Sequence, residues 1–286
     1  MASMRDIKRR RESIESTEQI TKAMKLVATV KLQKARTRAE QSKPYALRMY
    51  STVSAILKMS TGIRHRYLEE HEGGKAAVVL ITGNRGLAGG YNQNVIRLVT
   101  SEGFTPENSV IYTLGRKGRE YFGARGYTLS DDWSDVINEP LYKDAIQLTN
   151  VLLEAFTAGE ISSIYLVYTE FKNTVSHIPH LIRLLPVSEV ETSVDIEIPE
   201  DLPMNFEPDD TEVLDEIIPQ YLASLFYGAM LQSVASENGA RMSAMDAATD
   251  NAEEMIDRLS LEYNRARQGA ITQELTEIIA GSQAVS

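Results

Sequence analysis

The stretch that decides the fold is IKRRRESIESTEQITKAMKLVATVKLQKARTRA, residues 7–39, which contains neither Gly nor Pro. Apolar or small residues recur in it at spacings of three, four and seven: Ile7, Ile14, Thr21, Met24, Ala28, Leu32, Ala35 and Ala39. This spacing predicts a helix with one narrow contact stripe. The intervening Lys, Arg, Glu, Gln and Ala favour helix as well. We expect one helix from about Met4 to about Leu57.

A second long helix is predicted at the other end of the chain. Residues 220–286 contain no Pro, and Pro219 is tolerated in a first helical turn, so the helix is expected to begin after Pro219. Its expected stripe is Leu222, Leu225, Ala229, Ser233, Ser236, Ala240, Ala244, Ala247, Ala252, Met255, Leu259, Ala266, Leu275 and Ile279. Each helix is about 50 to 60 residues, or roughly 75 to 90 Å, long.

Two helices of this length cannot each be buried in a domain of this size. We therefore expect them to pair along their narrow stripes as a long antiparallel coiled coil, because a closed domain separates them in the sequence. The alternative is a compact bundle of shorter helices, broken at Pro44 in the first segment and at Gly228, Gly239 or Gly269 in the second.

The middle of the chain, residues 75–200, has the pattern of an α/β domain. Short apolar runs at 76–82, 110–114 and 164–168 predict buried strands, and helical patterns at 92–100, 116–122 and 143–156 lie between them. This alternation predicts a Rossmann-like, mostly parallel sheet. Residues 175–187 are expected to add an edge strand, since Pro179 and Pro186 interrupt them. The expected domains are 1–61, a helix; 62–212, the α/β domain with an acidic linker; and 213–286, a helix.

Composition excludes several classes of protein. The 286 residues include no Cys, which excludes disulfides, thiolate catalysis and Cys-type metal sites, and the net charge of −10 argues against a general nucleic-acid binder. Charge is uneven: residues 1–48 hold six Lys and seven Arg against five acidic residues. Acidic residues interrupt the basic start, so we expect no targeting peptide and a protein kept in the cytoplasm.

The most enzyme-like motif is GNRGLAGG, residues 83–90, between a predicted strand and a predicted helix. A phosphate-binding P-loop continues with Lys and then Ser or Thr, whereas Tyr91 and Asn92 follow here. We therefore expect a tight turn rather than a nucleotide site. His177 and His180 flank Pro179 and lack a third ligand, so neither a metal nor a cofactor is expected.

Four collinear motifs resemble the γ subunits of F-type ATP synthases, and the resemblance covers the whole chain. The motifs are ITKAMKLVA at 20–28, RGLxGG at 85–90, RMxAMxxATxNA at 241–252 and ITxExxEIxxG at 271–281. That family implies a rotor shaft without a catalytic site, whose paired helices pass through an α3β3 hexamer. Its α/β domain would touch the ε subunit and the c-ring of Fo, and proton flow would turn the whole rotor.

The resemblance also implies which residues meet the partners. Arg267, Gln268, Thr272 and Glu274 would meet a loop of β and form a catch. Arg9, Lys22 and Lys25 would face the acidic lever region of β, with Met24 nearby, and Arg241 completes the expected contact set. The protein would then lie at the cytoplasmic face of the cell membrane, as a peripheral subunit.

Ala88 stands where the family's loop often has Cys, and the cysteine-bearing chloroplast insert is absent, so thiol regulation is excluded and a bacterial protein is favoured. Two other classes remain open. One is a structural coiled-coil spacer with an α/β hinge, and the other is a free-standing α/β enzyme that binds a nucleotide at Gly83–Gly90.

Overall fold

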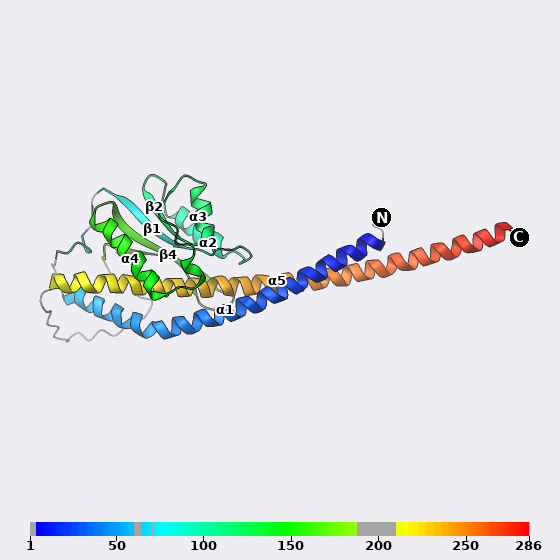
Figure 1. Cartoon of the computed structure of the whole chain (residues 1–286), viewed down its shortest axis with the longest axis horizontal. Coiled ribbons are helices and arrows are strands. Elements are labelled where there is room, and N and C mark those ends of the chain that lie inside the picture. The colour runs from blue at the N-terminus through cyan, green and yellow to red at the C-terminus, as the bar shows by residue number, and fades with distance from the viewer. Residues whose placement is uncertain (1–3, 60–63, 70, 72, 188–209, 286) are drawn as a thin grey trace. The chain divides into compact units, whose positions relative to one another are not determined.

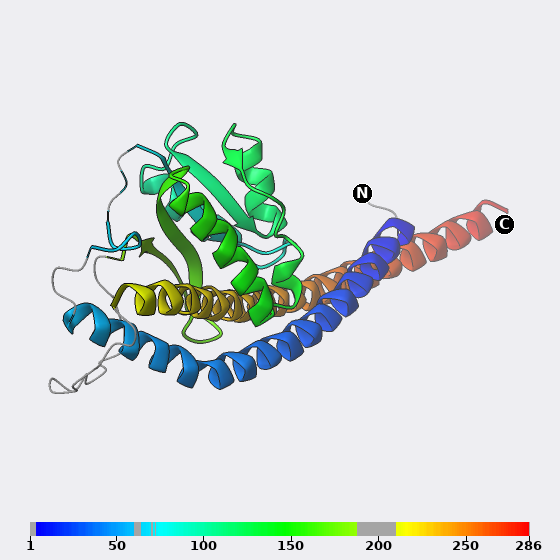
Figure 2. The ribbon, with the colours of Figure 1, turned by 60° about the vertical axis from the view of Figure 1, so that its left-hand side comes forward.

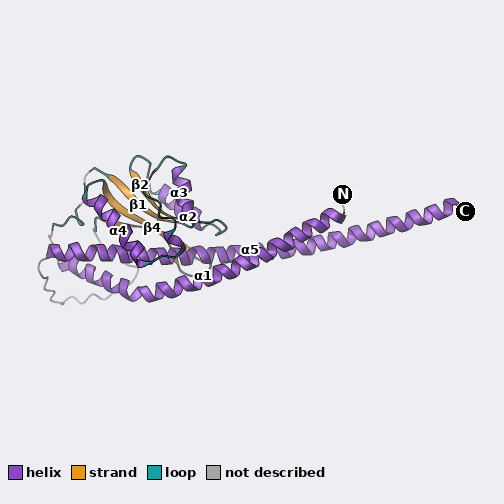
Figure 3. Ribbon diagram, viewed as in Figure 1, coloured by secondary structure: helices purple, strands orange, loops and turns teal. Residues whose placement is uncertain are grey.

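A computed structural model describes residues 4–59, 64–69, 71, 73–187 and 210–285. Its elements are helices α1 (Met4–Met59), α2 (Tyr91–Ser101), α3 (Arg116–Gly123), α4 (Tyr142–Thr157) and α5 (Asp210–Val285), the 3-10 helix η1 (Val136–Asn138), and strands β1 (Lys75–Ile81), β2 (Ser109–Leu114), β3 (Thr128–Leu129), β4 (Ile161–Phe171) and β5 (His177–Leu185). Figure 3 shows the strands gathered in one sheet and the two long helices.

The chain divides into two compact units. The first consists of Met1–Ala28 with Arg241–Ser286, and the second is Thr29–Ala240. The boundary between the units falls within both long helices, because α1 (56 residues) continues past Ala28 and α5 (76 residues) begins before Arg241. The continuous helices confirm the expected rods and contradict the compact bundle, because Pro44 interrupts nothing.

In the first unit, the start of α1 and the end of α5 form an antiparallel pair, which we call the terminal pair (residues 4–28 and 241–285). Lys22 meets Glu253 and Lys25 meets Asp246, so partner numbers fall along α5 as they rise along α1. Figures 1 and 2 both show the start of α1 alongside α5, and Figure 1 shows the last part of α5 continuing beyond it. Ile7, Thr21 and Ala28 of the expected α1 stripe are buried here.

The second unit holds a five-stranded sheet of order β3-β2-β1-β4-β5. β1 is parallel to both β2 and β4, and β5 lies at the edge of the sheet, as the sequence predicted; β5 is antiparallel to β4, a direction that the sequence had not predicted. Side chains alternate between the two faces because the pleat has a period of two. One face, with Val79 and Ile81, packs on α4 and α5, and the other, with Val78 and Leu80, packs on α2 and α3.

Two details of α5 correct the sequence-based expectation. The helix begins at Asp210 and passes through Pro219, although Pro lacks the N–H that a helix interior uses. Full burial of Leu214 and Ile218 on the sheet holds that first part in place. The expected stripe also fails toward the far end, where four of its members are exposed: Ala247, Met255, Leu275 and Ile279.

Candidate functional site

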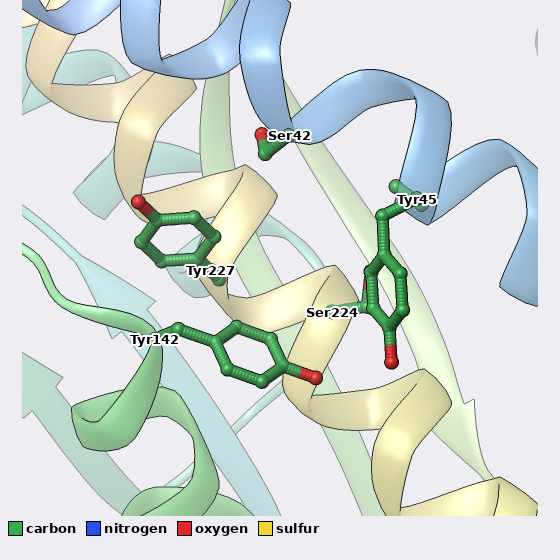
Figure 4. Close-up of a pocket in the computed structure, with 6 residues that line it drawn as sticks. Ser42, Tyr45, Tyr142, Ser224 and Tyr227 are labelled. Atoms are coloured by element: carbon green, nitrogen blue, oxygen red, sulfur yellow. The ribbon is translucent and has the colours of Figure 1, made fainter.

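A small cavity of about 240 Å³ lies between three helices of the second unit. Figure 4 shows its lining: Ser42, Tyr45 and Ala46 of α1, Tyr142 at the start of α4, and Ser224 and Tyr227 of α5. Burial, followed by a hydrogen bond with Tyr45, raises the pKa of Tyr142 above its ordinary value. The phenol therefore stays neutral at physiological pH, and no lining residue is a carboxylate, an amine or an imidazole.

The loop from Gly83 to Gly90 is the tight turn that the sequence predicted. The Gly83 N–H donates to Asn92 Oδ1 at 2.8 Å, and Asn92 Nδ2 donates to the Arg85 carbonyl at 3.4 Å. Leu87 has a φ of 61° and Gly89 a φ of 54°, which turn the chain from β1 into α2. The asparagine side chain thus takes up the first N–H of the loop, which a phosphate would otherwise use.

A carboxylate stands where a bound phosphate would need positive charge. A Cβ placed on Gly83 would lie 2.5 Å from Oε1 of Glu237, so α5 closely approaches the loop. Glu237 is only 8% exposed. A carboxylate side chain, and not a Lys or Arg, borders the loop at Gly83, which weakens the nucleotide-enzyme alternative.

The two histidines of β5 are used separately. His180 Nε2 lies 3.0 Å from Glu170 Oε2, whereas His177 packs against Phe171 and Gly239. Within the described ranges, no group of three His, Asp or Glu side chains is placed to hold a metal ion.

The terminal pair is joined by polar contacts at its centre. The buried hydroxyls of Thr21 and Thr249 lie 2.7 Å apart, and Lys25 forms an ion pair with Asp246. Lys22 bonds to Glu18 and also to Glu253, and these two bonds raise the pKa of its amine above the ordinary value. The amine therefore remains charged throughout the physiological range.

The expected partner-contact residues fall into two groups. Met24, Lys25 and Arg241 are half-buried in the terminal pair, while Lys22 is exposed. Arg9 is also exposed, and its Nη2 atom lies 3.8 Å from Oδ1 of Asp6. The second group is exposed on the last part of α5: Arg267, Gln268, Thr272 and Glu274.

Within the second group, the Thr272 hydroxyl donates to the Gln268 carbonyl at 2.9 Å. The helix therefore presents these side chains outward, without a described partner from α1. The sequence alone does not identify Asp246, Thr249 or Glu253 as site residues, although they are the contacts of Lys25, Thr21 and Lys22 on α5. A polar Thr21 within an otherwise apolar stripe was the available signal for such a polar contact.

Comparisons with known proteins agree along the whole chain. Residues 3–285 match the family model described as ATP synthase. The ATP synthase gamma chain of Lachnoclostridium phytofermentans is 57% identical, with 100% of both chains covered. The sodium ion specific ATP synthase gamma chain of Acetobacterium woodii is 40% identical, with 99% of each chain covered.

Solved structures share the fold. A chain of the Euglena gracilis mitochondrial ATP synthase, in an OSCP/F1/c-ring structure, matches with a TM-score of 0.67 at 17% identity, covering 99% of this chain and 94% of that one. A chain of the Tetrahymena thermophila central stalk and c-ring matches with a TM-score of 0.58 at 21% identity, covering 80% and 99%. On the full-length family match and the identity to its bacterial relatives, this chain belongs to the family of ATP synthase gamma chains.

Proposed function

We propose that this chain is the central rotor shaft of an F1Fo ATP synthase. It has no catalytic site of its own and couples rotation of the c-ring to the conformational cycle of the β subunits. Membership of the gamma chain family supports this role, as do the continuous helices α1 and α5. A stiff rod can carry torque over its length, whereas a bundle of short helices would bend at every loop.

The end of α5 is the single observation that carries the proposal. Figure 1 shows α5 continuing past the N-terminal end of α1, and Ile271, Leu275, Ile278 and Ile279 on this part are 48–64% exposed. Their spacing places them along one side of the helix. An unpaired helix of this length is marginal in water, and such an apolar stripe marks an interaction surface. A surrounding α3β3 hexamer would cover it.

The two groups of partner-contact residues would meet two different zones of such a ring. Arg267, Gln268, Thr272 and Glu274 would form the catch with a β loop, close to the apolar stripe. Lys22 and Lys25 would face the acidic lever of β, with Arg9, Met24 and Arg241. Their present ion pairs are half-exposed, at 52% and 40% for the two lysines. Exposed ion pairs contribute little to stability, so we expect the exchange of a present partner for a β carboxylate at each step to cost little free energy.

We further propose that segments 1–61 and 213–286 form the shaft. Segment 62–212 would provide the contacts with the ε subunit and the c-ring of Fo. In the part of the chain that the structure describes, no helix is both long and apolar enough to cross a membrane. We propose a peripheral position at the cytoplasmic face of the cell membrane, held there through the complex. Protons are the proposed coupling ion, and sodium is the alternative that the Acetobacterium relative's name raises.

Reconstitution tests this function directly. Added to purified α3β3, the chain should restore rotation and ATP turnover, and it should co-purify with α, β and ε in fixed proportions. A structural spacer would not affect α3β3, and a free-standing enzyme would bind nucleotide by itself. In vesicles holding the whole complex, ATP-driven pumping with and without sodium identifies the ion.

The catch has its own test within the same assay. Arg267→Ala combined with Gln268→Ala should lower torque and ATP turnover, because the proposed bonds to β are lost. Thr100→Ala on α2 is the matched control, since its exposed hydroxyl bonds only to the Arg97 carbonyl of its own helix. Unchanged torque in the double variant would remove both residues from the catch.

A further inference from the structure

Strand β4 extends beyond its neighbour β1. The last β1–β4 pair is Leu80 with Val167, whereas Tyr168 to Phe171 continue to pair with β5 alone. On the β1 side, the backbone of this extension has no strand beside it. Buried backbone N–H and C=O groups need hydrogen-bond partners, so another element must supply them.

Helix α5 supplies those partners with its side chains. The Thr169 N–H donates to Ser233 Oγ at 3.3 Å, and Ser236 Oγ donates to the Thr169 carbonyl at 3.2 Å. The Phe171 N–H donates to Gln232 Oε1 at 3.1 Å. The three helix residues lie on one face of α5, and both serines are fully buried. In effect, this face of α5 replaces the missing strand.

Two glycines allow side chains to pack closely against the backbone near these bonds. A Cβ on Gly83 would lie 2.5 Å from Glu237 Oε1, so in its present position the glutamate side chain fits against the loop because residue 83 has no side chain. A Cβ on Gly239 would lie 2.9 Å from His177 Cε1 and 3.0 Å from Phe171 Cε2. The loop after β1 and the β4–β5 hairpin thus both contact α5 at close range.

The position of this contact in the sheet is informative. Strand order reverses between β1 and β4, because β2 lies on one side of β1 and β4 on the other. In open α/β sheets, ligands bind at the carboxyl ends of the strands at this switch point. Here residues 232–239 of α5, which we call the socket segment, occupy that edge.

We infer that the socket segment is the torque-bearing joint of the rotor. In this joint α5 occupies the edge of the sheet where other α/β proteins bind a ligand, and its side chains fix it to the backbone of the α/β domain. The inference rests on the proposed function. Torque that enters the α/β domain must pass into α5, and bonds from side chain to backbone resist slip along and around the helix. Ser233 and Ser236 are therefore positioning residues for rotary coupling.

The first test removes the lock. Ser233→Ala combined with Ser236→Ala is compared with the control Thr100→Ala combined with Ser101→Ala, whose hydroxyls bond only to carbonyls of their own helix. We expect hydrogen exchange at the Thr169 amide to rise roughly 5- to 30-fold in the first variant alone. In vesicles with the whole complex, the ratio of ions pumped to ATP hydrolysed should fall, while hydrolysis continues. An unchanged ratio would overturn the inference.

The second test restores the lock with a covalent bond and guards against simple misfolding. A Cβ on residue 83 lies 3.3 Å from Glu237 Cγ, where the sulfur of a cysteine at 237 would stand, and the chain has no native Cys. Gly83→Cys with Glu237→Cys should therefore form a disulfide. Added to the serine double variant, it should restore the pumping ratio when oxidised and not when reduced.

The outcomes separate the joint from the proposed function. If the oxidised disulfide in the otherwise unchanged chain stops pumping, then the α/β domain must move relative to α5, and the joint is refuted. If the unchanged chain itself fails to drive rotation in α3β3, the proposed function fails. Normal rotation by the unchanged chain, with a normal pumping ratio in the serine variant, refutes the joint alone.

Discussion

Replacing Thr21 with valine tests how the two helices of the terminal pair hold together. The Thr21 hydroxyl lies 2.7 Å from that of Thr249 and 2.9 Å from the Glu18 carbonyl, and Thr249 also bonds to the Met245 carbonyl at 2.8 Å. Both threonines are buried, at 8% and 5% exposed. Valine keeps the shape and removes the hydroxyl.

The expected magnitude follows from the bonds lost. Each hydroxyl has a single hydrogen, so only two of these three bonds can form at once, and a bond to a helix carbonyl that already accepts a backbone N–H contributes little. Thr21→Val therefore loses chiefly the interhelical bond, about 1 kcal/mol, and leaves the Thr249 hydroxyl to donate to the Met245 carbonyl. Thr249→Val should have the same effect for the same reason. The double variant should lose about 1 kcal/mol and not the sum of about 2, because the interhelical bond is lost only once.

Native-state hydrogen exchange of the full chain is the suitable assay, because it reports local opening of the terminal pair without unfolding the second unit. A loss of about 1 kcal/mol should speed exchange of amides near Thr21 roughly fivefold. Thr17→Val is the control, since its exposed hydroxyl bonds only to the Ser13 carbonyl. Strictly additive effects of the two single variants would refute a bond between the two hydroxyls.

Three further outcomes are expected. Phe226→Ala opens a cavity in the core between α5 and the sheet and should cost about 3–5 kcal/mol, as measured by denaturant unfolding followed through the fluorescence of the single Trp133. Hydrogen bonds from Lys34 and Arg38 lower the pKa of the Glu139 carboxyl. These ion pairs should therefore stabilise the fold above the ordinary carboxyl pKa, and the stabilisation should be lost as the pH falls through the lowered pKa. Glu139→Gln should remove this contribution to the acid dependence of the unfolding free energy, as measured at low salt. Burial lowers the pKa of His177, so as the pH falls this histidine takes up a proton in the unfolded chain before it does so in the folded chain. Stability should therefore fall as the pH drops below about 6.5. The unfolding midpoint of His177→Phe should not show this pH dependence, and a pH profile equal to that of the unchanged chain would contradict the prediction.

Much of the site could be located on the sequence but not assembled from it. Thr21 belonged to the expected stripe of the first helix, and Lys22 and Lys25 followed from the family resemblance. Their partners could not be identified, because Thr249 is 228 positions away and many acidic residues of α5 were equally available. The same reason hid the three bonds from α5 to β4, since each unites segments more than sixty positions apart.

The sequence by itself determined the two long helices, every strand of the sheet except the short β3, and the absence of a P-loop at Gly83–Gly90. These depend on residue spacing and on Gly and Pro placement, which are local properties. Only the tertiary structure decided that α5 begins at Asp210 despite Pro219, and that it fills the edge where β1 and β4 end. Burial of Leu214 and Ile218 outweighs the lost helix bond at Pro219, and such packing energy exists only once distant segments meet.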